Sequence, residues 1–122
     1  MKVANTELTI LNILWSESPL TIGQIISRAQ QSTDWHDNTI KTIVTRLFKK
    51  ELISRAKDGK QFFYMPVVEK SQVIDQASDS LLGRFFDGKL SPLIAHFAQN
   101  KKLDDKDIKE IEAILKQMKH DD

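Results

Sequence analysis

Side chains that could read DNA bases lie on one face of a single predicted helix, residues 38–50. Apolar residues recur there at helical spacing and define the face that packs inward: Ile40, Ile43, Val44 and Leu47. The opposite face carries polar side chains: Asn38, Lys41, Thr42, Thr45 and Arg46. In the major groove, lysine or arginine binds guanine, asparagine binds adenine and threonine contacts the thymine methyl group. This face predicts readout of double-stranded DNA; the alternative is an ordinary solvated face, which any surface helix has.

Basic side chains continue beyond this face. Residues 41–60 hold seven basic and two acidic residues, although the whole chain has a net charge of only +1. Among those at the end of the helix or after it, four are spaced to reach phosphates: Lys49, Arg55, Lys57 and Lys60. Contacts of cations with phosphates position a protein on DNA without reading sequence. We expect these four residues to bind the DNA backbone, although exposed lysines also keep sheet edges soluble.

Two more helices must support the polar face. With 122 residues, four glycines and three prolines, the chain is sized for one mostly helical domain with at most a small appendage. Apolar spacing predicts helices over residues 5–16 and 21–31. Asn5 or Thr6 is the expected N-cap of the first and Thr21 that of the second, while Asp37 or Asn38 is expected to cap the helix that carries the polar face.

A basic hairpin is predicted after these helices. Two short alternating runs, 52–57 and 60–65, flank the pair Asp58–Gly59, which is typical of a type I′ turn. Three helices followed by a hairpin indicate a winged helix-turn-helix over residues 1–67. The fold class is therefore mainly α with a small β-hairpin wing.

The C-terminal segment, residues 68–122, is expected to be helical and to form a dimer. Helices are predicted over about 69–86, 91–99 and 104–119. Their apolar residues exceed what one isolated helix can bury: Val73, Ile74, Ala77, Leu81, Leu82, Phe85, Phe86, Leu93, Phe97, Ile111 and Leu115. A segment of this length has few residues with which to form its own hydrophobic core. We therefore expect these side chains to pack against a second copy of the chain. The alternative is a single monomeric core in which these helices fold back on the winged helix.

Several functional classes are disfavoured. The absence of cysteine excludes disulfides, thiolate metal sites and thiol catalysis. We expect no catalytic residues, no metal and no cofactor, because no nucleophile, base and orienting group are assembled in the sequence. With no predicted membrane segment or leader, a cytoplasmic protein is expected. Two alternatives remain: a winged-helix regulator that binds a small ligand directly, and an interaction module without DNA binding.

These motifs together resemble the penicillinase repressor family, also called the BlaI/MecI/CopY family. Residues 7–15 are similar to its opening helix, with an acidic residue followed by a Leu-Trp pair, and residues 39–47 to its recognition helix of the form TV-x-T-x-x-x-RL. Residues 49–55 and the Phe63–Tyr64 pair match the run into the wing. The resemblance implies a homodimeric repressor on a palindromic operator of the TACA/TGTA type, read by Lys41, Thr42, Thr45 and Arg46.

Two departures from the family pattern bear on regulation. Copper-responsive members of the family carry a C-terminal cysteine cluster, which this chain lacks. Members that respond to β-lactams are inactivated when a sensor-protease triggers cleavage at an Asn–Phe bond. The aligned bond here is His96–Phe97, which the resemblance makes the candidate cleavage position.

Overall fold

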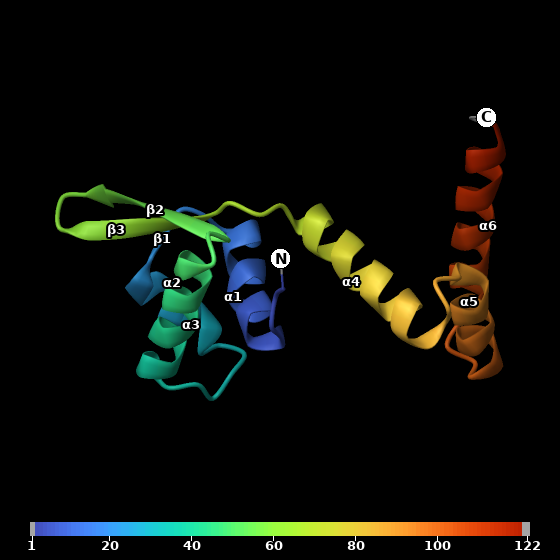
Figure 1. The fold of residues 1–122 in the computed structure, drawn as a ribbon, viewed down its shortest axis with the longest axis horizontal. Helices are drawn as coiled ribbons and strands as arrows, with labels where there is room; N and C mark the ends of the chain where they lie inside the picture. The colour runs from blue at the N-terminus through green and yellow to red at the C-terminus, as the bar shows by residue number, and fades with distance from the viewer. Residues whose placement is uncertain (1, 121–122) are drawn as a thin grey trace. The chain divides into compact units, whose positions relative to one another are not determined.

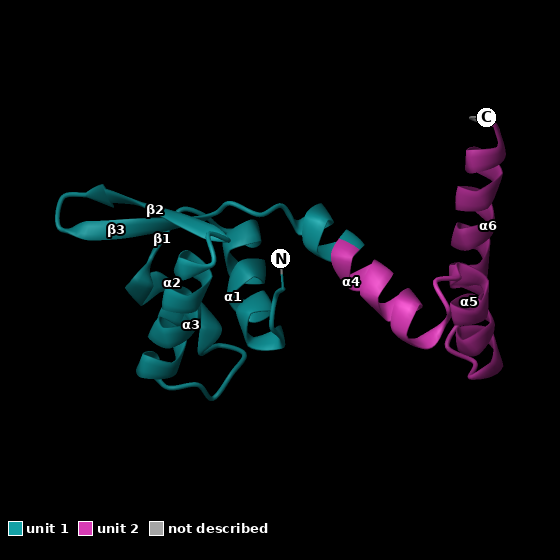
Figure 2. Cartoon of the chain, in the orientation of Figure 1, with its two compact units in different colours: residues 1–75 teal, residues 76–122 magenta. Residues whose placement is uncertain are grey.

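The computed structural model describes residues 2–120, which divide into two compact units (Figure 2). The first unit runs to Asp75 and the second begins at Gln76. The division lies inside the helix α4 (Lys70–Phe85), whereas the sequence-based division at residues 67 and 68 precedes that helix. Each unit is described below by itself.

The first unit is a winged helix-turn-helix, as predicted (Figure 1). Its elements follow in the order α1 (Asn5–Ser16), β1 (Leu20–Thr21), α2 (Ile22–Ala29), α3 (Asp37–Lys49), β2 (Ile53–Asp58) and β3 (Gln61–Pro66). The three strands form an antiparallel sheet in the order β1-β3-β2. The sequence did not predict β1, because two residues cannot display an alternating pattern.

The core of this unit lies between α1, α2, α3 and the sheet. Its largest fully buried apolar side chains are Ile10, Leu11, Leu14, Ile25, Ile40 and Leu47. Trp15 joins the chain beyond the sheet to this core, because its Nε1–H donates to the carbonyl of Val68 at 2.9 Å. Val73 also belongs to this core and is only 8% exposed. This burial leaves little of the Val73 side chain, a predicted dimer residue, accessible to a second copy.

The helix starts differ from the predicted caps at two of three positions. Thr21 caps α2 as expected, since its Oγ1 accepts from the amide of Gln24. The N-cap of α1 is Ala4 and not Asn5 or Thr6. The Ala4 amide donates a hydrogen bond to the Glu7 side chain. His36 precedes α3. Asp37, an expected cap, accepts a hydrogen bond from Gln30 at 2.7 Å, which ties the start of α3 to the end of α2.

The hairpin turn lies one residue beyond the predicted position. Asp58 pairs with Gln61, so the two loop residues are Gly59 and Lys60. Of these two loop residues, only Gly59 has a positive φ, of 66°. A type I′ turn requires positive φ at both loop residues, whereas a type II′ turn requires it only at the first, where glycine is preferred. The predicted type I′ turn is therefore wrong.

A left-handed residue ends α3 and starts the wing. Glu51 has φ of 64°, and its amide donates to the carbonyl of Phe48 while the amide of Leu52 donates to that of Leu47. This pair of bonds is a Schellman motif, in which the left-handed position is usually occupied by glycine. The motif turns the chain sharply, so β2 begins directly after the basic end of α3.

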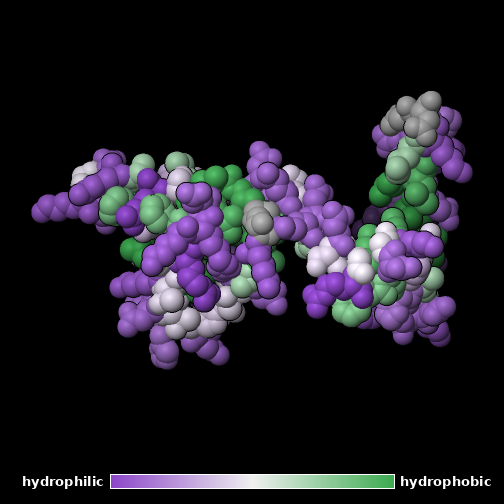
Figure 3. Space-filling view, in the orientation of Figure 1, coloured by the Kyte–Doolittle hydropathy of each residue, from purple (hydrophilic) through white to green (hydrophobic). Residues whose placement is uncertain are grey.

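The second unit contains the later part of α4, α5 (Leu90–Gln99) and α6 (Asp105–His120). Asp104 caps α6 by accepting from the amide of Asp107 at 2.8 Å. No side chain among residues 76–120 is fully buried, and hydrophobic side chains lie exposed along α6 (Figure 3). No helix within residues 2–120 has the length and apolar character required to cross a bilayer.

Candidate nucleic-acid interface

The predicted base-reading side chains lie together on the outward face of α3. They line one open hollow along the helix, together with a predicted phosphate-binding lysine: Asn38, Lys41, Thr42, Thr45, Arg46 and Lys49. The inward face carries the fully buried Ile40 and Leu47, so tertiary packing orients the polar face outward. We call these six residues the α3 face.

Two threonines of the α3 face have their hydroxyl protons already engaged. Thr42 Oγ1 donates to the carbonyl of Asn38 and Thr45 Oγ1 donates to that of Lys41, each at 2.9 Å. These bonds fix both side-chain rotamers. What each threonine presents outward is therefore a methyl group and oxygen lone pairs, which suit a thymine methyl group or a base amino group.

One flank of α3 is tied to α1 through a fully buried carboxylate. Glu7 is 0% exposed, and its Oε1 accepts from Lys50 Nζ at 2.7 Å and from the amide of Ala4 at 2.9 Å. Its Oε2 lies 3.9 Å from Arg46 Nε and has no hydrogen-bond partner within residues 2–120. Arg46 Nη2 also donates to Thr6 Oγ1, at 3.4 Å. Lys50 and Arg46 lie one helical turn apart, so Glu7 contacts two successive turns of α3.

The surroundings of Glu7 keep it ionised. Burial raises the pKa of the Glu7 carboxyl, but the hydrogen bonds from Lys50 and the Ala4 amide and the charges of Lys50 and Arg46 lower it by more. The pKa of Glu7 therefore lies below its ordinary value of 4.5. At neutral pH the α1 side of α3 holds one negative charge between two positive ones.

The opposite flank of α3 is joined to the wing by a stacked arginine. The guanidinium carbon of Arg55, on β2, lies 4.3 Å from the ring centre of Phe48 on α3 and 4.1 Å from that of Phe62 on β3. We call these three residues the wing stack. The Arg55 side chain has no hydrogen-bond or ion-pair partner within residues 2–120, so the N–H groups of its guanidinium are free to bind an anion.

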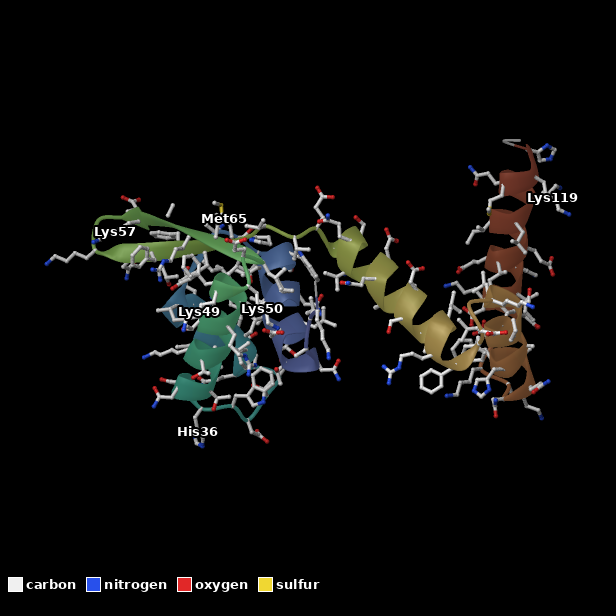
Figure 4. The ribbon with its side chains drawn as sticks, viewed as in Figure 1. His36, Lys49, Lys50, Lys57, Met65 and Lys119 are labelled. Carbon is white, nitrogen blue, oxygen red and sulfur yellow. The ribbon has the colours of Figure 1, made fainter. Side chains whose placement is uncertain are left out.

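The remaining wing cations extend from the hairpin. Lys57 points away from the body of the unit near the hairpin tip, while Lys49 and Lys50 lie at the end of α3 (Figure 4). Lys57 Nζ is also 5.9 Å from the ring centre of Phe62, and Lys60 is an exposed turn residue. The four predicted phosphate-binding cations therefore come from α3, β2 and the turn.

Sequence reasoning missed five of the residues that organise this surface: Thr6, Glu7, Lys50, Phe48 and Phe62. Glu7 stands in the sequence only within the family motif of residues 7–15, and Phe62 only within the predicted strand of residues 60–65. Thr6, Glu7 and Lys50 act through contacts with a distant segment, such as Thr6 with Arg46, which helical and strand periodicity do not reveal. Glu7 has one local signal, its position three residues after the N-cap in the first helical turn. At that position its side chain accepts a hydrogen bond from the Ala4 amide.

The predicted dimer residues other than Val73 lie at exposed or half-buried positions. Exposed members are Ile74, Ala77, Leu81, Phe85 and Leu115, and half-buried members are Leu82, Phe86, Leu93, Phe97 and Ile111. The candidate cleavage bond lies within α5, where the His96 ring packs edge-on against Phe97 with ring centres 5.9 Å apart.

Comparison with known proteins places this geometry in a family. The family model described as penicillinase repressor matches residues 3–117. The penicillinase repressor of Bacillus licheniformis is 29% identical over 119 residues, which cover 98% of this chain and 93% of that protein. The methicillin resistance regulatory protein MecI of Staphylococcus aureus is 32% identical over 114 residues, which cover 93% of each chain.

A solved structure also resembles the chain. It is the solution structure of the monomeric form of Bacillus licheniformis BlaI in complex with the blaP half-operator, at 27% identity and a TM-score of 0.53. The match covers 58% of this chain and 87% of that one. The solved structure agrees with the winged helix, and the family model and the relatives show that the chain belongs to the penicillinase repressor family.

Proposed function

We propose that this protein is a DNA-binding transcriptional repressor that acts in the cytoplasm. The observation that carries the proposal is the α3 face, where groove-compatible side chains line one hollow between the wing stack and the Glu7 contacts. In this proposal Asn38, Lys41, Thr42, Thr45 and Arg46 read bases, while Lys49, Arg55, Lys57 and Lys60 bind phosphates. The half-operator complex of the related BlaI supports DNA binding by the proposed repressor.

The operator in this proposal is a TACA/TGTA-type palindrome, bound by a homodimer. A two-fold symmetric protein places one recognition helix on each half of a palindrome. Exposed apolar side chains in the second unit support a dimer, since Phe85 is 67% exposed and Leu115 53% exposed in the single chain. A second copy would remove this apolar surface from water.

The experiment that tests the proposal is a titration of the full chain on two fluorescent duplexes, the palindrome and a scrambled version of it. Anisotropy is recorded at two salt concentrations, and the stoichiometry is read from the same curves. We expect two chains per palindrome and an affinity at least ~10³-fold higher than for scrambled DNA. Equal affinity for the two duplexes contradicts the proposal.

We also propose that a sensor-protease, if it controls this repressor, acts at His96–Phe97. His96 is exposed and Phe97 half-buried, but the bond lies inside α5, so cleavage requires local unfolding of that helix. Mass spectrometry of the chain after exposure to the active form of the sensor tests this. A cut adjacent to Phe97 is expected, and an intact chain contradicts it.

A further inference from the structure

We propose that Glu7 and Thr6 are positioning residues for base recognition: they hold the Arg46 guanidinium in the orientation in which it reads a single base pair. This inference rests on the proposed function, since it assigns a task to a side chain of the α3 face. Neither residue lines the α3 face itself. Both lie on α1 and face the Nε and Nη2 nitrogens of the Arg46 guanidinium.

The geometry divides the nitrogens of Arg46 between protein and solvent. Nε faces the buried Oε2 of Glu7 at 3.9 Å, and Nη2 donates to Thr6 Oγ1 at 3.4 Å. Nη1 has no hydrogen-bond partner within residues 2–120, and the Arg46 side chain is 51% exposed. Nη1 and the second N–H of Nη2 are thus left for two acceptors on one base edge, the pattern that guanine offers in the major groove.

The unpartnered carboxylate oxygen indicates that this contact tightens when DNA binds. Glu7 Oε2 is buried without a hydrogen bond, which is unfavourable for a charged oxygen. Arg46 Nε faces this oxygen at 3.9 Å, a distance longer than a hydrogen bond. Fixing the guanidinium against a base would bring Nε into hydrogen-bond range of Oε2, so specific binding would also satisfy the buried oxygen.

Lys50 keeps Glu7 in place for this task. Its Nζ donates to Glu7 Oε1 at 2.7 Å and to the Lys2 carbonyl at 3.2 Å, so the carboxylate has one oxygen anchored and the other directed to Arg46. Figure 4 shows Lys50 beside α1, whereas Lys57 extends freely from the hairpin. A carboxylate held at one oxygen is a rigid support for the arginine.

The test measures discrimination base pair by base pair. The wild-type chain and the variants Arg46→Ala, Thr6→Val and Glu7→Gln are titrated on the palindrome and on duplexes with one base pair changed symmetrically in both half-sites. We expect Arg46→Ala to lose discrimination at one base pair, by about tenfold. Thr6→Val and Glu7→Gln should lose it at that same base pair, and Thr6→Val should add nothing in the Arg46→Ala background.

Matched controls separate positioning from charge and from folding. Glu17→Gln makes the same charge change at a glutamate paired with Arg28 of α2, and Thr9→Val makes the same hydroxyl deletion one turn along α1. Both are expected to keep wild-type discrimination at every base pair. Thermal melting monitors the fold, and because Thr6 is exposed its variant remains informative if Glu7→Gln unfolds.

The contrary results are distinct. If Thr6→Val and Glu7→Gln weaken binding to every duplex by the same factor, their role is structural and the inference is wrong. It is also wrong if Arg46→Ala leaves discrimination unchanged at all base pairs. A wild-type chain that does not prefer the palindrome overturns the proposed function, and the inference with it. A wild-type preference combined with unchanged discrimination at every base pair in Thr6→Val and Glu7→Gln overturns the inference alone.

Discussion

Arg55 on β2 is stacked on Phe62 of the neighbouring strand, with 4.1 Å between the guanidinium carbon and the ring centre. Phe48, from the last turn of α3, lies against the same guanidinium, with 4.3 Å between the guanidinium carbon and its ring centre. Both rings are more than a third exposed, so neither is a core residue. The wing and the recognition helix are therefore joined by a cation whose hydrogen-bonding edge remains free.

Phe62→Leu is expected to weaken binding to both the palindrome and scrambled DNA by about two- to fivefold. The reason is the loss of one cation–π contact, worth about 0.5–1 kcal/mol at an exposed site, which leaves Arg55 less ordered. Anisotropy titrations measure the effect. Met65→Leu, at a β3 position that pairs with Ser54 and not with Arg55, is the control. Equal affinities of Phe62→Leu and wild type would refute the role of the wing stack.

Thr45→Ala and Lys60→Ala are expected to impair DNA binding in different ways. Thr45→Ala removes a methyl group and an acceptor from the α3 face and should reduce discrimination between operator and random DNA by about 1–3 kcal/mol. Lys60→Ala should weaken all DNA alike and reduce the slope of log affinity against log salt by about 0.9. Titrations at several salt concentrations distinguish them. Identical profiles would contradict the division into base readers and phosphate binders.

Glu51→Gly is expected to stabilise the first unit by about 0.5–1 kcal/mol. Glu51 occupies a left-handed conformation, with φ of 64°, that costs a residue with Cβ more than it costs glycine. Urea denaturation measures the change. Lys49→Gly, two residues earlier inside α3, should instead destabilise by about 1 kcal/mol. Destabilisation by Glu51→Gly would show that the wild-type turn carries no strain.

Stability is expected to fall with acid below pH 4.5 through Glu7. The pKa of Glu7 is lower in the folded protein than its ordinary value of 4.5. Its contribution to the free energy of unfolding is therefore complete above that pH and is lost as the pH falls toward the folded pKa.

Lys50→Met removes a hydrogen bond to the charged Glu7 carboxylate and should lower the free energy of unfolding by about 1–3 kcal/mol at pH 7.

Urea denaturation between pH 3 and pH 7 measures this dependence. Glu7→Gln should flatten it, whereas Glu17→Gln should change it little, because solvent screens the exposed pair of Glu17 with Arg28. A pH dependence unchanged by Glu7→Gln would show that other carboxylates dominate acid unfolding.

Phe85→Asp or Leu81→Asp is expected to produce monomers. Both side chains are exposed in the single chain, at 67% and 42%, and a charge placed in an apolar interface is strongly unfavourable. Analytical ultracentrifugation measures the mass, with Ser80→Asp as a control of equal charge on α4. A dimer that persists in both variants would show that other residues form the interface.

The helices of the first unit and the character of its polar face were predictable from the sequence. Helical periodicity is a local property, and in Ile40, Ile43, Val44 and Leu47 it coincides with the buried side of α3. The order of three helices and a basic hairpin then indicated the winged helix. The type II′ turn and the caps of α1 and α3 were missed, because hydrogen bonds such as Gln30 to Asp37 decide between adjacent residues of similar propensity.

The contacts that orient the functional side chains arise only in the folded protein. Thr6 meets Arg46 across 40 positions of the chain, and Lys50 meets Glu7 across 43. Arg55 on β2 contacts Phe48 and Phe62 only because the fold packs β2 against the end of α3 and pairs it with β3. Periodicity indicates which face of a helix is polar, but the direction of a charged side chain depends on partners that the fold brings from distant segments.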